Sequence, residues 1–211
     1  LGNIVDTIPV KNYWVDMIPA IRSSGSILKP LLYAAMCQRG LITPKMLLPD
    51  IPMNIAGFQP ETFSRDYKGA VPADEVIQQS LNIPSVRMLQ EFGVAAFLQY
   101  LKELGFTGLR DRADYYGLAL ILGGAEISAW DLAKVYSQLV YDYQYFLDNN
   151  SYPNTNEPDL NIIRSKHEGS DQDFHSEHIL KAGAIFNMLE AMSGNRSTIG
   201  HQAHFLNGKI A

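Results

Sequence analysis

The sequence is poor in cysteine, in long apolar runs and in basic residues, and each shortage excludes a class of protein. Cys37 is the one cysteine among 211 residues, so the chain forms no internal disulfide and no multi-cysteine metal site. No apolar run approaches the roughly 18 to 20 residues that cross a membrane. The formal net charge of −5 argues against nucleic acid or an anionic lipid surface as a partner.

The first residues, Leu-Gly-Asn-Ile-Val, also lack the pattern of a signal peptide, because no basic segment precedes an apolar one. They contain no initiator methionine, and we expect the chain to be a segment of a longer protein. Apolar residues make up 46% of the chain and charged residues 18%, which is enough apolar content to bury a core.

Apolar periodicity and helix-ending residues predict a largely helical chain. We expect helices over residues 28–39, 74–80, 85–92, 94–104, 129–140 and 179–192. Pro30 falls in a first turn, where a missing N–H costs little, and Gly40 follows the same helix as a left-handed cap. Ser128, with Asp131 three residues later, has the spacing of a helix cap. We predict that Cys37 lies on a buried helical face.

Residues 148–178 differ from the rest of the chain in composition. They are rich in Asn, Asp, Ser and Glu, and this predicts a polar insertion or exposed loop within one domain that spans residues 1–211.

Ser26 and Lys29 have the spacing of a nucleophile and its base. They are three residues apart at the start of a predicted helix, which places both side chains on one face. A serine hydroxyl is a poor nucleophile until a base takes its proton, and an amine can do so if its pKa falls from about 10.4 towards neutrality. On spacing alone, a capping serine beside a solvated lysine is the commoner explanation.

Ser80 and Asn82 form a second candidate pair. A serine hydroxyl there could relay a proton, and the asparagine amide could bind a substrate carbonyl. The same Ser-x-Asn spacing occurs at Ser193 and Asn195, so the spacing does not choose between the two.

The sequences around these pairs resemble the transpeptidase domain of class A penicillin-binding proteins, and most of all its 1C type. The resemblance rests on residues 25–34, 39–44, 58–63, 79–89 and 116–128, in the order of the family's motifs. Thr62 stands where many relatives have Asn. The resemblance is good over residues 1–147, fades over 148–178 and returns faintly over 179–211.

The resemblance implies an α+β fold, the penicillin-recognising serine transpeptidase or β-lactamase-like architecture, of which this chain is mainly the helical part. It implies a parent protein that crosslinks peptidoglycan stem peptides ending in D-Ala-D-Ala and is acylated by β-lactams. Ser26 would attack the D-Ala-D-Ala carbonyl, and Lys29 would deprotonate it. Ser80 would pass a proton to the leaving amine, and Asn82 would hold the acyl-side amide.

The resemblance implies no metal and no cofactor. It places the work on the periplasmic side of the cytoplasmic membrane, with the parent anchored there although no membrane span is expected in this chain. Lys209-Ile210-Ala211 is not the family's third motif, Lys-Thr-Gly, which helps to bind the substrate carboxylate and supplies an oxyanion donor. We therefore expect the chain to be inactive when it is alone.

Two other functions stay open at this point. The chain could be a β-lactamase or β-lactam sensor of the same superfamily, or a helical module that binds without reacting. Two histidine pairs, His175 with His178 and His201 with His204, have a spacing that could suit a metal, but no carboxylate pattern completes a site. We expect these to be solvated surface histidines.

Overall fold

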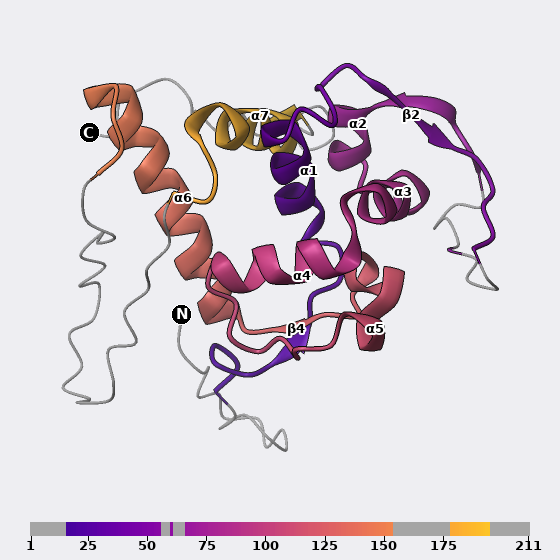
Figure 1. The fold of residues 1–211 in the computed structure, drawn as a ribbon, viewed down its shortest axis with the longest axis horizontal. Coiled ribbons are helices and arrows are strands. Elements are labelled where there is room, and N and C mark those ends of the chain that lie inside the picture. The colour runs from indigo at the N-terminus through magenta and orange to yellow at the C-terminus, as the bar shows by residue number, and fades with distance from the viewer. Residues whose placement is uncertain (1–15, 56–59, 61–65, 154–177, 195–211) are drawn as a thin grey trace, which may run out of the picture.

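The computed structural model describes residues 16–55, 60, 66–153 and 178–194, which form a mainly helical body with a few short strands (Figure 1). The elements follow the chain in the order β1 (Arg22–Ser23), α1 (Lys29–Gln38), β2 (Leu47–Asp50), β3 (Gly69–Pro72), α2 (Ala73–Gln78), α3 (Asn82–Phe92), α4 (Val94–Glu103), α5 (Ala113–Tyr116), the 3₁₀ helix η1 (Gly117–Leu122), β4 (Glu126–Ile127), α6 (Ala129–Asn149) and α7 (Ala182–Ser193).

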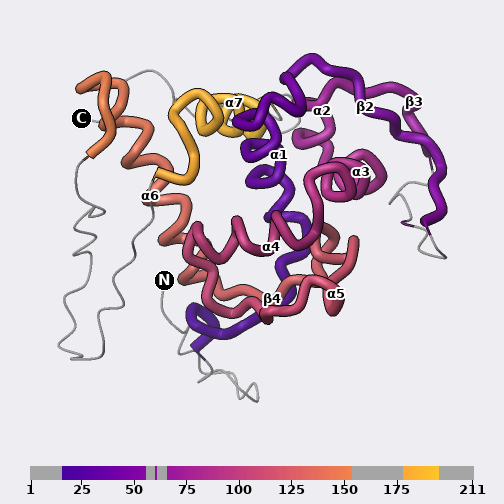
Figure 2. Tube along the Cα trace, viewed as in Figure 1, coloured from indigo at the N-terminus to yellow at the C-terminus, as the bar shows by residue number. Residues whose placement is uncertain are grey.

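Helix α1 runs through the middle of this body and is apolar on nearly every side. Leu31, Leu32, Tyr33, Ala34 and Met36 are all 0% exposed. A helix that is apolar all round must be covered on all sides, and α1 is surrounded by α2, α3 and α7, with α4 below it in the view of Figures 1 and 2. The packing of α1 therefore makes its first residue, Lys29, a buried one.

Two small antiparallel pairs of strands complete the body. Strand β1 pairs with β4, with Arg22 opposite Ile127 and Ser23 opposite Glu126. Strand β2 pairs with β3, from Leu47 opposite Pro72 to Asp50 opposite Gly69. The β1–β4 pair joins the segment that leads into α1 to the segment that leads into α6, about a hundred residues later in the sequence.

The predicted helices are confirmed with shifted ends. Gly40 has a φ of 69°, as expected of a left-handed cap, and the Ser128 hydroxyl accepts a hydrogen bond from Asp131 N. Helix α3 begins at Asn82, earlier than predicted, because Pro84 falls in its first turn, where no partner for its missing N–H is needed. Helix α6 continues to Asn149, nine residues past its predicted end at residue 140, so the predicted polar insertion begins inside a helix.

The prediction that Cys37 is buried is wrong in degree, since its side chain is only half-buried near the end of α1. Several predictions concern residues outside the described part: residues 58–59 and 61–63, most of the polar insertion, and Lys209-Ile210-Ala211. Among the helices described, none combines the length and the apolar character that a membrane crossing requires.

Candidate active site

Lys29 lies beneath the surface at the start of α1 and donates to three neutral oxygens. Its side chain is 1% exposed. Nζ lies 2.7 Å from Ser80 O, 3.2 Å from Ser80 Oγ and 2.8 Å from Asn82 Oδ1. An ammonium has three N–H donors, so these three oxygens match its capacity. Within the described residues, no carboxylate forms an ion pair with Lys29.

Burial lowers the pKa of Lys29 from its usual 10.5 to about 8. The cause is desolvation, which penalises the charged ammonium, and no carboxylate of the described residues offsets that penalty. Lys29 is therefore buried, and it is not the solvated lysine that the spacing alone favoured. An amine with a pKa near 8 is deprotonated in an appreciable fraction of molecules at neutral pH, as a general base requires.

Ser26 lies in the exposed turn that precedes α1. The turn is held by hydrogen bonds from Ile27 N to Ser24 O at 3.3 Å and from Lys29 N to Ser26 O at 3.1 Å. Ser26 is exposed, and within the described residues its hydroxyl makes no hydrogen bond to Lys29 Nζ. The structure therefore brings Lys29 together with Ser80 and Asn82, and places Ser26 at the same end of α1 with its hydroxyl accessible.

Ser80 reaches Lys29 because its backbone takes a conformation that is unusual for serine. Its φ is 51°, in the left-handed region. Helix α2 ends here in a Schellman motif, in which Leu81 N donates to Val76 O at 3.0 Å and Ser80 N donates to Ile77 O at 3.1 Å. Glycine is the usual residue at this position, and a side chain there costs about 1–2 kcal/mol. Ser80 keeps this strained backbone while its carbonyl oxygen and its hydroxyl oxygen both accept hydrogen bonds from Lys29 Nζ. Such strain marks a position of functional interest.

Asn82 is the first residue of α3, two positions after Ser80, and is half-buried. The tight end of α2 and the start of α3 thus place Ser80 and Asn82 on the same amine. The alternative serine, Ser193, lies at the end of α7, where its hydroxyl donates to Glu190 O at 2.9 Å. Of the two Ser-x-Asn pairs, it is therefore Ser80 and Asn82 that lie beside Lys29.

Gly123 supports the turn that carries Ser26, a role that the sequence did not reveal. The Ser23 hydroxyl donates to Gly123 O at 2.7 Å. A Cβ on Gly123 would lie 3.0 Å from Ser23 Oγ and 3.1 Å from Gly25 Cα, and its φ of +110° is unfavourable for any L side chain. The two adjacent glycines, Gly123 and Gly124, were the available signal, because they permit a close approach of two backbones.

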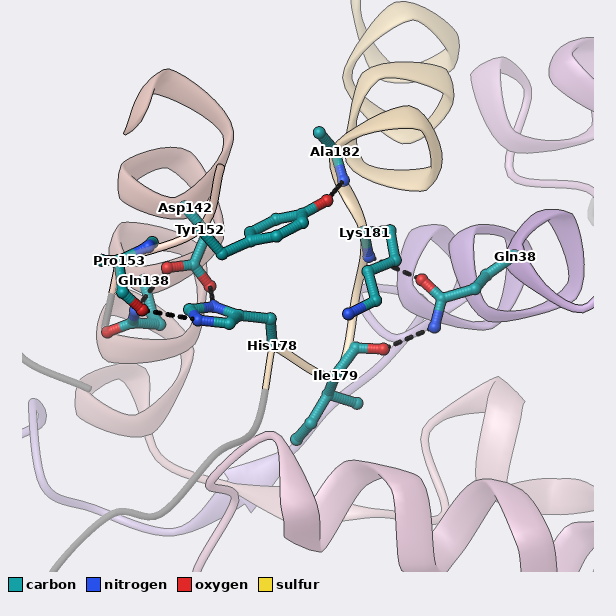
Figure 3. A network of polar contacts seen from close by, with 9 residues as sticks. All are labelled: Gln38, Gln138, Asp142, Tyr152, Pro153, His178, Ile179, Lys181 and Ala182. Carbon is teal, nitrogen blue, oxygen red and sulfur yellow. Dashed lines mark hydrogen bonds and ion pairs between the residues drawn. The ribbon is translucent and has the colours of Figure 1, made fainter. Parts of the chain in front are cut away.

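His178 corrects one of the expectations for the histidines. It is not solvated: Nδ1 lies 3.2 Å from Asp142 Oδ2, and Nε2 lies 3.0 Å from Pro153 O (Figure 3). The other three histidines of the two pairs lie outside the described residues. Across the part of the chain that is described, no cluster of His, Cys, Asp and Glu has the arrangement of a metal site.

Comparisons with known proteins identify the family. The profile of the family described as "Penicillin binding protein transpeptidase domain" matches residues 10–143, more than half of the chain. Penicillin-binding protein 1C of Escherichia coli strain K12 is 36% identical over 123 residues, which are 58% of this chain and 16% of that protein. The chain spans less than a fifth of the length of the first curated relatives that it matches.

Solved structures give the same fold. The penicillin-binding protein PonA1 from Mycobacterium tuberculosis superposes with a TM-score of 0.61 at 16% identity, over 84% of this chain and 48% of that one. PonA1 in complex with penicillin V superposes with a TM-score of 0.54 at 19% identity, over 61% of this chain and 37% of that one. The predicted fold, a partial transpeptidase domain that is mainly helical, is confirmed.

Proposed function

This chain belongs to the penicillin-binding protein transpeptidase domain family, a family of peptidoglycan synthesis, and from this premise we propose that it carries the acylation half of a D,D-transpeptidase active site. Ser26 is the nucleophile and Lys29 is its base. The observation that carries the proposal is a buried lysine whose three hydrogen bonds go to Ser80 and Asn82, and which has no carboxylate partner among the described residues.

Lys29 suits the role of base because its neutral form is accessible near pH 8. In the proposed reaction Lys29 takes the proton of the Ser26 hydroxyl as Oγ attacks the carbonyl carbon of the D-Ala-D-Ala peptide bond. The bond to the terminal D-Ala breaks, and an acyl-serine forms. The amine of a second stem peptide then attacks the acyl-serine and releases Ser26.

Ser80 and Asn82 have the roles that their contacts suggest. The Ser80 hydroxyl, 3.2 Å from Lys29 Nζ, passes the proton from the lysine to the departing amine. The Asn82 amide, which accepts from Lys29 through Oδ1, has an NH₂ group able to donate to the acyl-side carbonyl of the substrate. Hydrogen bonds between Lys29 and these two residues keep the proton path short.

The partners follow from this assignment. We propose that the protein containing this chain crosslinks stem peptides ending in D-Ala-D-Ala on the periplasmic side of the cytoplasmic membrane, where it is anchored. β-Lactams carry a strained amide in place of the D-Ala-D-Ala bond and would acylate Ser26. Neither a metal nor a cofactor enters this scheme.

The test of the nucleophile is labelling by a fluorescent penicillin. We would offer it to this chain and to a longer form of the protein that includes a Lys-Thr-Gly segment. The label should map to the peptide containing Ser26, and Ser26→Ala should remove it while the control Ser193→Ala keeps it. We expect the longer form to react about 100- to 1000-fold faster, because Lys-Thr-Gly would supply an oxyanion donor. Label found on Ser80 or Ser193 would contradict the assignment.

The test of the base uses Lys29→Arg, which keeps the charge but cannot accept a proton, since a guanidinium stays protonated. Acylation should fall by about 10²- to 10⁴-fold with an unchanged circular dichroism spectrum. An Arg variant that reacts at the wild-type rate would mean that Lys29 supplies only positive charge. Rapid loss of the label would favour a β-lactamase or sensor, and no label in the longer form would favour a non-catalytic module.

A further inference from the structure

A pocket lies at the opposite end of α1 from Lys29. Its volume is about 640 Å³, within the range of roughly 300–1,000 Å³ typical of small-molecule sites. It is lined by Ala35, Gln38, Arg39, Tyr100, Glu103, His178, Ile179 and Lys181. Helix α1 has ten residues at about 1.5 Å each, so this pocket is roughly 15 Å from the amine cluster and shares no residue with it.

Two cations, Arg39 and Lys181, lie on the rim of this pocket. The Arg39 guanidinium stacks 4.0 Å above the Phe92 ring, and Lys181 Nζ lies 5.0 Å from the centre of the Tyr152 ring. Neither forms an ion pair with any residue in the described ranges. Aromatic stacking orients the guanidinium and leaves its N–H edge available, as recognition of a carboxylate requires.

The wall that carries Lys181 is fixed by a network of hydrogen bonds (Figure 3). The Gln38 amide donates to Ile179 O and accepts from Lys181 N, both at 2.6 Å. The Tyr152 hydroxyl accepts from Ala182 N at 2.6 Å. The Gln38 contacts join the end of α1 to the start of α7, and the Tyr152 contact joins the segment after α6 to the same helix. The pocket is therefore formed before any ligand arrives, and little ordering cost remains on binding.

The remaining lining residues define the charge and the shape of a ligand. Glu103 is the one carboxylate among the lining residues, so with Arg39 and Lys181 it gives a formal charge of +1 when His178 is neutral. That charge suits one carboxylate better than a dianion. Ala35 and Ile179 add apolar surface. Tyr100 is 7% exposed, and its buried hydroxyl has no hydrogen-bond partner among the described residues.

We propose that this pocket binds an amino acid or a short peptide in its zwitterionic form. Arg39 and Lys181 hold the carboxylate, Glu103 accepts from the ammonium group, and the apolar residues contact the small side chains. Each charged group of the rim would then lie beside a ligand group of the opposite charge. This site does not depend on the proposed acylation chemistry, because none of its residues takes part in that chemistry.

The experiment is a titration of the ¹⁵N-labelled chain with L-Ala-L-Ala, followed by NMR at the Lys181 and Ala182 amides. Two analogues dissect the binding: the C-terminal amide, which lacks the carboxylate, and the N-acetylated peptide, which lacks the ammonium. Arg39→Gln and Lys181→Gln should each weaken binding of the dipeptide about tenfold or more, the loss expected for one charge-assisted hydrogen bond. Arg112→Gln, which removes an exposed arginine of the ion pair with Asp114, is the matched control and should change nothing.

The outcomes separate the possibilities. The proposal is supported if the dipeptide saturates the shifts, the amide analogue binds at least about tenfold more weakly, and Glu103→Gln weakens the dipeptide but not the acetylated peptide. It is overturned if no saturation occurs up to about 10 mM, or if the amide analogue binds as well as the acid. Penicillin labelling of Ser26 is read separately, so failure of one idea leaves the other standing.

Discussion

The buried amine of Lys29 should make the stability of the chain depend on pH in a measurable way. The pKa of Lys29 is about 8 in the folded chain and 10.5 when the residue is solvated. Between these values the unfolded chain binds more protons than the folded chain, so folding stability rises with pH. Below about pH 8 the full penalty applies, and above about pH 10.5 it is gone.

The size of the effect follows from the shift. A difference of one pKa unit is worth about 1.36 kcal/mol, so the total penalty is about 3 kcal/mol. About 1.5 kcal/mol of it should be recovered between about pH 8 and about pH 9.5. Other groups act in the opposite direction. Burial raises the pKa of the Cys37 thiol and raises that of Tyr136 to about 12, so the contribution of each group to folding stability falls as the pH rises.

The assay is urea unfolding of the wild type and of Lys29→Met over that pH range. Subtracting the two curves cancels the thiol and the tyrosines, because both proteins contain them. The free energy of unfolding of the wild type minus that of Lys29→Met should rise by about 1.5 kcal/mol over this pH range. The control Lys134→Met, at an exposed lysine of α6, should show the same pH dependence of stability as the wild type. A flat difference, together with a Lys29 amine that titrates near 10.5 by NMR, would refute the reasoning that burial depresses this pKa.

Two further predictions concern backbone geometry beside the site. Ser80→Gly and Ser80→Ala both remove the hydroxyl and should both slow penicillin acylation, but the Gly variant should be roughly 0.5–1 kcal/mol more stable than the Ala variant by urea unfolding, because Ser80 has a φ of 51°. Equal stabilities would show that this backbone is not strained. Gly123→Ala should lower the free energy of unfolding by about 1–3 kcal/mol and slow acylation, because its Cβ would press on the turn that holds Ser26. The control Gly183→Ala, in α7 where nothing lies within 4 Å of the new Cβ, should stabilise the chain by about 0.4–1 kcal/mol. A Gly123→Ala variant as stable as the wild type would contradict the close approach.

Local signals in the sequence determined the helices well. Helix α1 was placed by Pro30 at one end and Gly40 at the other, and the cap at Ser128 by its spacing to Asp131, because such signals act over a few residues. The predicted ends of helices were less accurate where the sequence has no clear residue that ends a helix. Helix α6 continues past the predicted end at residue 140 as far as Asn149, and Asn150, with a φ of 50°, ends it there.

The candidate site could be predicted as a set of residues but not as an arrangement. Order along the chain and family resemblance selected Ser26, Lys29, Ser80 and Asn82, while the spacing of Ser193 and Asn195 matched as well as that of Ser80 and Asn82. Only packing decided which pair lies beside the amine, because contacts between residues more than fifty positions apart leave no periodic trace in one sequence.

The sequence by itself determined the longer helices α1, α3, α4, α6 and α7 and the short α2, the family motifs and the types of residue available for chemistry. The tertiary structure decided the state of Lys29, since its burial comes from helices that pack around α1 and not from its neighbours in the chain. It also decided that Gly123 lies against the turn of Ser26 and that Arg39, Glu103 and Lys181 share one pocket. Desolvation and close approach depend on which atoms meet in space, and a linear pattern does not record that.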